Sequence, residues 1–307
     1  MYDCIVIGGG PAGLSAALLL GRCRRRVLLC DSGEPRNRWA TAVNGFFSRD
    51  GVPPLQLLSL ARDQLGAYDT VELREVCVED AERVDGAFEV LLPGGARARA
   101  RTLLLATGVV DDVPAIDGFA EAYGRTVHHC PYCDGWEYRD RRLAVYGRGD
   151  AGYGLALGLT AWTDHVVLCT DGPSELDHPR RTELEEIGVE LREEPVERLA
   201  VTEGRVHAVR LAGGVTVPCD GVFFSTGQRQ ASPLPAKFGC HFTSKGAVAT
   251  GTRERTEVPG LYVAGDASKN SQLVSIAVAE GTEAGFEIHQ ELLRADLAAR
   301  RRAFQVR

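Results

Sequence analysis

An α/β fold of two domains, the second inserted in the first, is predicted by three observations. Two β-prone runs each end in a glycine turn followed by a helix-compatible segment, with the turns at 8–13 and 147–152. A further β-prone run, 102–108, precedes the second of these units, and another, 260–266, follows it. Because strands that alternate with helices form parallel sheets, this pattern indicates two Rossmann-like (three-layer ββα) dinucleotide-binding domains.

The length agrees with this organisation, since 307 residues exceed the ~100–200 residues of a typical domain. We place a discontinuous outer domain at 1–115 and 236–307, and the inserted domain at 116–235.

Charge and hydropathy narrow the class of protein. A net charge of −7 argues against a nucleic-acid partner, because phosphate binding depends on surplus Lys and Arg. We find no run of ~18 or more apolar residues and predict no membrane span. The apolar start lacks the basic region of an export signal, so a cytoplasmic enzyme is expected.

The first glycine turn, GGGPAG at 8–13, lies between a strand at 2–7 and the apolar segment 14–20. A second strand, 27–30, ends at Asp31, an acid 18 positions after the last glycine of the turn. This is the spacing of a dinucleotide-binding unit. The alternative is a glycine-rich turn of another α/β fold.

Each glycine of this turn has a physical reason. Gly8 allows the tight turn, Gly10 lets the backbone approach a pyrophosphate, and Gly13 lets helix and strand pack closely. The helix N-terminus then offers free N–H groups to the phosphates. Asp31 can accept hydrogen bonds from ribose hydroxyls.

Later units follow the same order. In the second unit, strand 143–146 leads into the turn at 147–152, a helix is expected at 154–161, and strand 166–169 follows. Asp266 ends the run 260–266, before a helix-compatible segment that starts at Gln272. Asp266 could contact a phosphate or polyol, or could simply be a helix N-cap.

The strongest chemical signal is Cys130-Pro131-Tyr132-Cys133-Asp134. A C-x-x-C pair is either a redox dithiol or half of a metal site. A zinc site needs two more ligands, and the chain has no second C-x-x-C, although His128 and His129 could contribute. Redox use needs an acid or base nearby, and Asp134, His128 or His129 could serve. At least one of these histidines is expected to be structural.

Nine cysteines, an odd number scattered along the chain, do not form a secreted disulfide framework. We expect the seven outside the pair to be inert packing residues. They are Cys4, Cys23, Cys30, Cys77, Cys169, Cys219 and Cys240.

Four motifs stand in a specific order: GGGPAG, ATG at 106–108, CPYCDG and GLYVAGD. Over essentially its full length the chain thereby resembles the low-molecular-weight thioredoxin reductase-like flavoproteins. The resemblance implies FAD in the outer domain, an NAD(P)-type inserted domain that includes the C-x-x-C pair, and a homodimer. The cofactor-binding residues it implies are Gly8, Gly10, Pro11, Ala12, Gly13, Asp31, Asn44, Ala106, Thr107, Gly108, Gly265, Asp266 and Gln272.

The same resemblance implies roles for individual side chains. Asn44 would lie near the isoalloxazine, and Asp266 would contact the polyol chain of the flavin. Cys133 would react with the flavin and Cys130 with substrate, while Asp134 or a neighbouring histidine such as His129 would be the acid/base.

The inserted domain departs from the NADPH-dependent members of the family. These have a basic H-R-R run after the second strand, whose arginines would hold the 2′-phosphate. Here that position reads Cys169-Thr170-Asp171-Gly172-Pro173. Asp171 would repel a 2′-phosphate, although it could accept from the ribose diol of NAD.

The motif C-P-Y-C-D-G-W-E, preceded by His128-His129, is similar to the corresponding segment of the gliotoxin- and holomycin-type dithiol oxidases. That branch closes disulfides in small natural products and passes the electrons to dioxygen. Asp134 does not discriminate, because the reductases share it. We therefore expect a dithiol oxidase that produces hydrogen peroxide.

Three alternatives stay open: a reductase of a thioredoxin-like protein fed by NADPH, NADH or ferredoxin, a flavin-binding module without turnover, and a structural zinc protein. The sequence does not name the dithiol. The segment 37–49, with Trp39, Phe46 and Phe47, could line a substrate pocket, or these aromatic side chains could be core residues or pack on the flavin.

Overall fold

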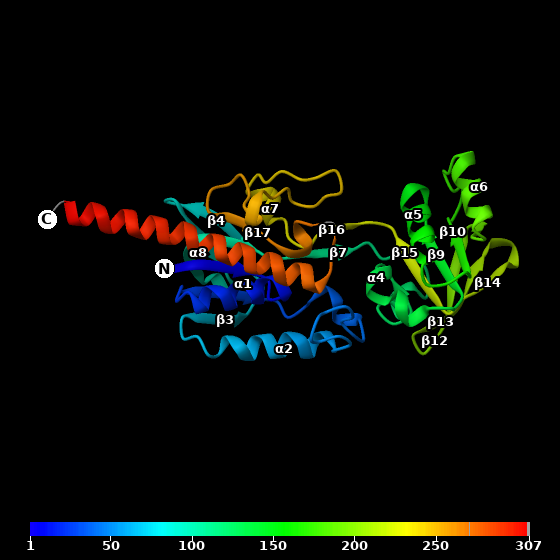
Figure 1. The fold of residues 1–307 in the computed structure, drawn as a ribbon, viewed down its shortest axis with the longest axis horizontal. Coiled ribbons are helices and arrows are strands. Elements are labelled where there is room, and N and C mark those ends of the chain that lie inside the picture. Colours follow the sequence, from blue (N-terminus) through cyan, green and yellow to red (C-terminus); the bar gives the residue numbers. More distant parts are fainter. Residues whose placement is uncertain (270, 306–307) are drawn as a thin grey trace. The chain divides into compact units, whose positions relative to one another are not determined.

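The computed structural model describes residues 1–269 and 271–305. It divides the chain into two compact units. Unit 1 comprises Met1–Arg36, Leu55–Val110 and Arg229–Arg307, and unit 2 comprises Asn37–Pro54 and Asp111–Gln228. The predicted α/β fold with parallel sheets is confirmed (Figure 1). The assignment of these units to two dinucleotides stays a prediction.

Unit 1 is built on one sheet with the strand order β3-β2-β1-β6-β5-β4, in which β17 also pairs with β6. The strands are β1 Tyr2–Ile7, β2 Val27–Asp31, β3 Val71–Glu75, β4 Asp80–Val84, β5 Ala87–Leu91, β6 Arg97–Leu105 and β17 Leu261–Val263. The strands β3, β2, β1, β6 and β17 are parallel, whereas β4 and β5 are antiparallel to their neighbours. The long β6 therefore belongs to both parts of the sheet.

Alternating residues of this sheet enter two cores, as the period of two in a strand requires. Val6 and Leu104 face the helix layer, and Ile5 and Leu103 face the side with Phe88. The helices of unit 1 are α1 Pro11–Arg22, α2 Pro54–Leu65, α7 Leu234–Lys237 and α8 Val274–Gln305. Helices α1 and α8 lie side by side against the parallel strands (Figure 1).

Unit 2 repeats the plan on a smaller scale. Its parallel sheet has the order β11-β10-β9-β15-β8, and a separate antiparallel sheet has the order β12-β13-β14. The strands are β8 Val127–His128, β9 Leu143–Gly147, β10 Val166–Cys169, β11 Glu190–Arg192, β12 Val196–Thr202, β13 Arg205–Leu211, β14 Thr216–Pro218 and β15 Gly221–Ser225. The helices are α3 Phe119–Ala122, α4 Pro131–Asp134, α5 Gly149–Leu159 and α6 His178–Glu186.

The two passages of the chain between the units form a short two-stranded sheet of their own. It pairs β7, Val109–Asp111, with β16, Gln228–Gln230. Among the residues that the structure describes, no helix has the length and apolar character needed to cross a membrane.

The prediction that all seven remaining cysteines are packing residues is wrong for Cys77, which is exposed, and Cys23 is only half-buried. Cys77 lies in the irregular segment after β3, between Val76 and Val78, which pack against the core, while its own side chain is exposed. Cys4, Cys30, Cys169, Cys219 and Cys240 are buried as predicted.

Candidate functional site

The C-x-x-C pair forms a disulfide in unit 2, between Cys130 and Cys133. Strand β8 leads into the pair, and Cys130 is the N-cap of the single-turn helix α4. The Cys133 backbone N–H donates to Cys130 Sγ at 3.2 Å. Pro131 stands at the first helical position, where its missing N–H costs nothing. The local sequence therefore holds the two sulfur atoms in a four-residue turn.

Asn44 lies against this redox turn. Its side-chain Nδ2 donates to the Cys133 backbone oxygen at 2.9 Å. Asn44 belongs to the segment Asn37–Pro54, which is part of unit 2 although most of unit 1 follows it in the chain. Whether Asn44 also lies near the isoalloxazine stays a prediction.

Asp134, the last residue of α4, is next to a buried histidine. His128 Nδ1 lies 3.3 Å from Asp134 Oδ2, and the His128 side chain is 6% exposed against 22% for Asp134. On its other side, His128 Nε2 lies 3.1 Å from the hydroxyl of Tyr138. That hydroxyl donates to the Arg125 backbone oxygen at 3.0 Å. Asp134, His128 and Tyr138 thus form a chain of polar groups that runs from the redox turn into the core.

His129 belongs to a different group. Its Nδ1 lies 3.4 Å from the Tyr123 hydroxyl and 3.9 Å from Asp111 Oδ2. The Tyr123 hydroxyl in turn donates to Asp111 Oδ2 at 2.7 Å. Of the two histidines proposed from the sequence, His128 is therefore the one in contact with Asp134. A catalytic role for His129 stays a prediction.

Large aromatic side chains of unit 2 are exposed on and around the redox turn. Tyr132, between the two cysteines, is 77% exposed, and Trp136 is 64% exposed. In the segment that contains Asn44, Trp39 is 56% and Phe47 is 93% exposed. Trp39 and Phe47 are therefore not core residues. Exposed aromatic surface of this kind often marks a binding site.

In unit 1 the first glycine turn packs tightly against the end of β6. A Cβ on Gly8 would lie 2.3 Å from the Ala106 oxygen, and one on Gly13 would lie 1.9 Å from the Gly8 oxygen. A Cβ on Gly10 would meet nothing within 4 Å. Gly10 is also the N-cap of α1 and makes no side-chain cap there. The turn therefore leaves open space at the N-terminus of a helix, which is where a pyrophosphate binds.

A buried polar atom close to this turn also indicates a ligand there. The Thr107 hydroxyl follows Ala106 at the end of β6, and it is buried without a hydrogen-bond partner among the described residues. Gly265 closes the cluster, since a Cβ there would come within 3.0 Å of the Ala12 Cβ. The structure thus brings together the predicted cofactor residues of three distant motifs.

The two acids predicted to bind the cofactor both have arginine partners. Asp31 Oδ2 forms an ion pair with Arg62 at 2.5 Å, and Asp31 Oδ1 accepts from the Gly9 N–H at 3.2 Å. Asp266 Oδ2 forms an ion pair with Arg36 at 2.8 Å, and Arg36 also donates to Gln272 at 2.5 Å. Asp266 is not the N-cap of α8, which begins only at Val274, and Gln272 belongs to the same group through Arg36. Their contacts with a cofactor stay predictions.

A buried carboxyl of α8 lies beside the turn that contains Asp266. Glu280 Oε2 accepts from the Gly265 N–H at 2.7 Å, and Glu280 Oε1 is buried without a partner among the described residues. Burial, reinforced by the nearby Glu254 carboxylate, raises the pKa of Glu280 to about 7. The sequence signal for this residue is an acid among the small and apolar residues of the buried face of α8, a face that also contains Glu287.

Glu280 should make the stability of the protein depend on pH. The folded protein keeps this proton up to about pH 7, whereas an unfolded glutamate loses it near ~4.3. The folded state therefore binds more protons between these values, and the free energy of unfolding falls as the pH rises through that window. Glu280→Gln should remove this fall and stabilise the protein at pH 8 by about 1–3 kcal/mol.

Urea unfolding at pH 5 and pH 8 measures this effect. The matched control is Glu283→Gln, an exposed position one turn further along α8. If Glu280→Gln and the control show the same difference between the two pH values, Glu280 does not contribute to the pH dependence.

The second glycine turn, between β9 and α5, has the same tight packing, because a Cβ on Gly152 would lie 2.4 Å from the Gly147 carbonyl carbon. After β10, Asp171 uses both carboxylate oxygens within the protein. Oδ2 accepts from the Tyr146 hydroxyl at 2.9 Å, and Oδ1 accepts from the Val196 N–H at 2.7 Å. Nearby, Arg181 pairs with Glu193 at 2.5 Å. Of these charged groups near the second glycine turn, Asp171 is an acid and Arg181 is already paired with a carboxylate of the protein.

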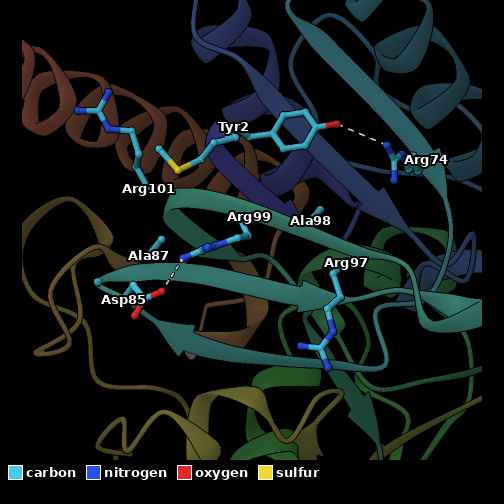
Figure 2. A pocket seen from close by; sticks show the side chains of 10 residues that line it. Tyr2, Arg74, Asp85, Ala87, Arg97, Ala98, Arg99 and Arg101 are labelled. Atoms are coloured by element: carbon cyan, nitrogen blue, oxygen red, sulfur yellow. Dashed lines mark hydrogen bonds and ion pairs between the residues drawn. The ribbon is translucent and has the colours of Figure 1, made fainter.

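A hollow of about 750 Å³ in unit 1 is lined by Met1, Tyr2 and four arginines (Figure 2). Each arginine has a carboxylate partner, so the positive charge is already balanced. The ion pairs are Arg74–Glu72 at 2.7 Å, Arg97–Glu82 at 3.1 Å, Arg99–Asp85 at 3.7 Å and Arg101–Asp3 at 3.0 Å. None of the predicted site residues lines this hollow. Within the described part of the chain, no cluster of three or more His, Cys, Asp or Glu residues could hold a metal ion.

The sequence did not predict the side chains that bond to the predicted site residues. These are Arg36, Arg62 and Tyr138, which contact Asp266, Asp31 and His128. An arginine in a helix or loop has no motif that reveals a partner 30 or more positions away. Tyr138 follows the redox motif closely, but only the structure shows that its hydroxyl is directed to His128.

Comparison with known proteins agrees with this geometry. The family model described as pyridine nucleotide-disulphide oxidoreductase matches residues 2–281. The chain is 30% identical to the thioredoxin reductase tcpT of Claviceps purpurea, over 100% of this chain and 98% of that one. It is also similar to the crystal structure of HlmI, with 37% identity, a TM-score of 0.93, and 98% and 96% of the two chains covered. A putative thioredoxin reductase TrxB from Bacillus anthracis has 28% identity and a TM-score of 0.91, with 96% and 100% covered.

Proposed function

We propose that this chain, which belongs to the pyridine nucleotide-disulphide oxidoreductase family, is a dithiol oxidase that forms a disulfide in a small-molecule dithiol. The chain is a thioredoxin reductase-like enzyme, and thioredoxin reductase-like members of the family are FAD-binding flavoproteins. The resemblance to this group that the sequence predicted is confirmed. In the proposed reaction one dithiol and one dioxygen give one disulfide and one hydrogen peroxide.

The observation on which the proposal depends is the disulfide between Cys130 and Cys133, in a segment that also contains Asp134 and the exposed aromatic residues Tyr132 and Trp136. A disulfide within a four-residue turn can accept two electrons from a dithiol through a mixed disulfide. Tyr132 and Trp136 offer apolar surface to a small organic dithiol.

The first glycine turn fits FAD. The open space at Gly10, the free helix N-terminus and the Thr107 hydroxyl without a partner suit a pyrophosphate and its neighbours. Asp31 and Asp266 would hold the ribose and the polyol chain. When bound, FAD supplies a two-electron acceptor that dioxygen can reoxidise.

The second glycine turn supports an oxidase over an NADPH-fed reductase. A 2′-phosphate needs unpaired arginine, and the acid Asp171 and the paired Arg181 stand in its region. The carboxylate of Asp171 is also engaged by Tyr146 and Val196, which weakens the case for an NAD ribose contact.

The similar proteins include one that supports the oxidase and others that support a reductase. The similarity to HlmI is what the resemblance to holomycin-type oxidases leads us to expect. The relatives named thioredoxin reductase favour the second candidate, reduction of a thioredoxin-like protein with electrons from NAD(P)H or ferredoxin. A homodimer and a cytoplasmic location stay predictions.

The test is anaerobic rapid mixing of the purified yellow holoenzyme with NADPH, NADH or dithiothreitol, followed by air. We expect dithiothreitol to bleach the flavin within seconds, the two nucleotides to bleach it at least about 10²-fold more slowly, and air to restore the colour with one peroxide for each dithiothreitol oxidised. Rapid bleaching by NADPH or NADH would establish the reductase instead.

A further inference from the structure

The hydrogen bonds around His128 determine which ring nitrogen is free to gain a proton. The Tyr138 hydroxyl has one hydrogen, which it donates to the Arg125 backbone oxygen. Its oxygen can then only accept from His128, so Nε2 is the protonated nitrogen of the neutral ring. Nδ1 is left with a lone pair, 3.3 Å from Asp134 Oδ2.

A proton placed on Nδ1 would turn this contact into an ion pair. The imidazolium would face the Asp134 carboxylate at 3.3 Å within a largely buried environment, where opposite charges attract strongly. The pair can therefore hold one exchangeable proton, taken up through Asp134, the more exposed of the two side chains.

Such a proton acceptor answers a chemical difficulty at the redox turn. A substrate thiol must lose its proton to attack the disulfide, and thiols have pKa values near ~8.5 against ~3.9 for an ordinary aspartic acid. An isolated carboxylate is thus a poor acceptor for a thiol proton. An imidazole is more basic than a carboxylate and is the better acceptor for a thiol proton.

We propose that His128 is a positioning residue that acts through Asp134, orienting the carboxyl and storing on Nδ1 the proton that a substrate thiol releases. This inference rests on the proposed dithiol chemistry and deepens it. His129 lies in a different group, beside Tyr123 and Asp111.

The steps balance in atoms and electrons. The first substrate thiol gives its proton to the Asp134–His128 pair, and the resulting thiolate bonds to Cys130 Sγ while Cys133 leaves as a thiolate. The second substrate thiol then attacks the substrate sulfur of the mixed disulfide and its proton passes to the departing Cys130. The substrate has lost two electrons, the enzyme disulfide has gained them, and one of the two protons remains on the pair.

Other charged groups lie close to the row of polar groups formed by Asp134, His128 and Tyr138. Those that act on Tyr138 besides Asp134 are Arg205, Arg141 and Glu137. The His128 ring also packs against the uncharged Phe223 of β15, at 5.5 Å between ring centroids.

The test is His128→Asn in the holoenzyme. Asparagine keeps a polar group toward Asp134 but cannot take a proton. Anaerobic enzyme is mixed with dithiothreitol, quenched with an alkylating reagent at set times, and the labelled Cys130 and Cys133 are counted by mass spectrometry. At pH 7 we expect the first exchange to be about 10²-fold slower than in the parent enzyme.

The pH profile separates proton storage from a merely structural role. Without the acceptor, the rate should follow the thiolate fraction of dithiothreitol and rise about tenfold per pH unit below ~8.5. The parent enzyme should show a much shallower rise. His207→Asn is the matched control, an exposed histidine on β13 of the same unit, and should behave as the parent does.

If His128→Asn is poorly folded, Tyr138→Phe provides the second variant, because it keeps the ring that packs on His128 and removes the bond to Nε2. It should steepen the pH profile in the same direction with a smaller loss of rate. A parent-like rate and profile in either folded variant overturns the role of His128. Failure of the proposed function would show differently, as unchanged turnover in Cys130→Ser.

Discussion

Cys133→Ser is expected to abolish dithiol turnover, with a loss of at least about 10³-fold, while the flavin stays bound. The reason is that a hydroxyl cannot form with Cys130 the disulfide that accepts two electrons from the substrate. Cys130→Ser should have an equal effect, because a pair that acts as one unit fails when either member is removed. Steady-state peroxide production with dithiothreitol measures the loss.

The control for these variants is Cys77→Ser. Cys77 is an exposed free thiol of unit 1, so the same substitution there removes a thiol without touching the disulfide. A spectrum unchanged at the flavin bands confirms that the cofactor is retained in all three proteins. Full turnover in either Cys130→Ser or Cys133→Ser would mean that the C-x-x-C pair is not the redox centre.

The elements that follow from periodicity and turn chemistry were predictable from the sequence. The strand at Tyr2–Ile7, the glycine turn and the strand ending at Asp31 occur as predicted, because a tight turn without Cβ atoms admits few other sequences. The same holds for the second unit at Leu143–Gly147.

Partners from distant segments were not predictable. Nothing in the run at 37–49 indicates that Asn44 would donate to the Cys133 backbone oxygen, since the contact joins positions 89 apart in the chain. For Cys77, composition favoured burial, but its place between two inward-facing valines reversed that preference.

At the redox site, too, some residues could be predicted from the sequence and others could not. Spacing identified Cys130, Cys133 and Asp134, yet three candidates for the acid/base were indistinguishable because His128 and His129 are neighbours in sequence. Strand β8 ends at His128 and the backbone bends at His129, and the His128 side chain meets Asp134 whereas the His129 side chain meets Tyr123. Only the three-dimensional structure supplies that difference.

Gly10→Ala is expected to weaken FAD binding without unfolding the protein. Gly10 has φ −74° and ψ −176°, a conformation open to alanine, and its added Cβ would meet nothing within 4 Å. The free energy of unfolding of the apoprotein should therefore change by less than about 1 kcal/mol. The methyl group would occupy the space that we assign to the pyrophosphate, so we expect FAD affinity to fall at least about tenfold.

Gly13→Ala provides the contrast, because its Cβ would lie 1.9 Å from the Gly8 oxygen and 3.3 Å from the Ala106 Cβ. Overpacking of this kind should destabilise the apoprotein by about 1–3 kcal/mol or more. Urea unfolding of the apoproteins and titration with FAD, followed by flavin fluorescence, measure the two effects separately. If Gly10→Ala binds FAD as tightly as the parent chain, the open space at this turn is not the pyrophosphate site, whatever its resemblance to one.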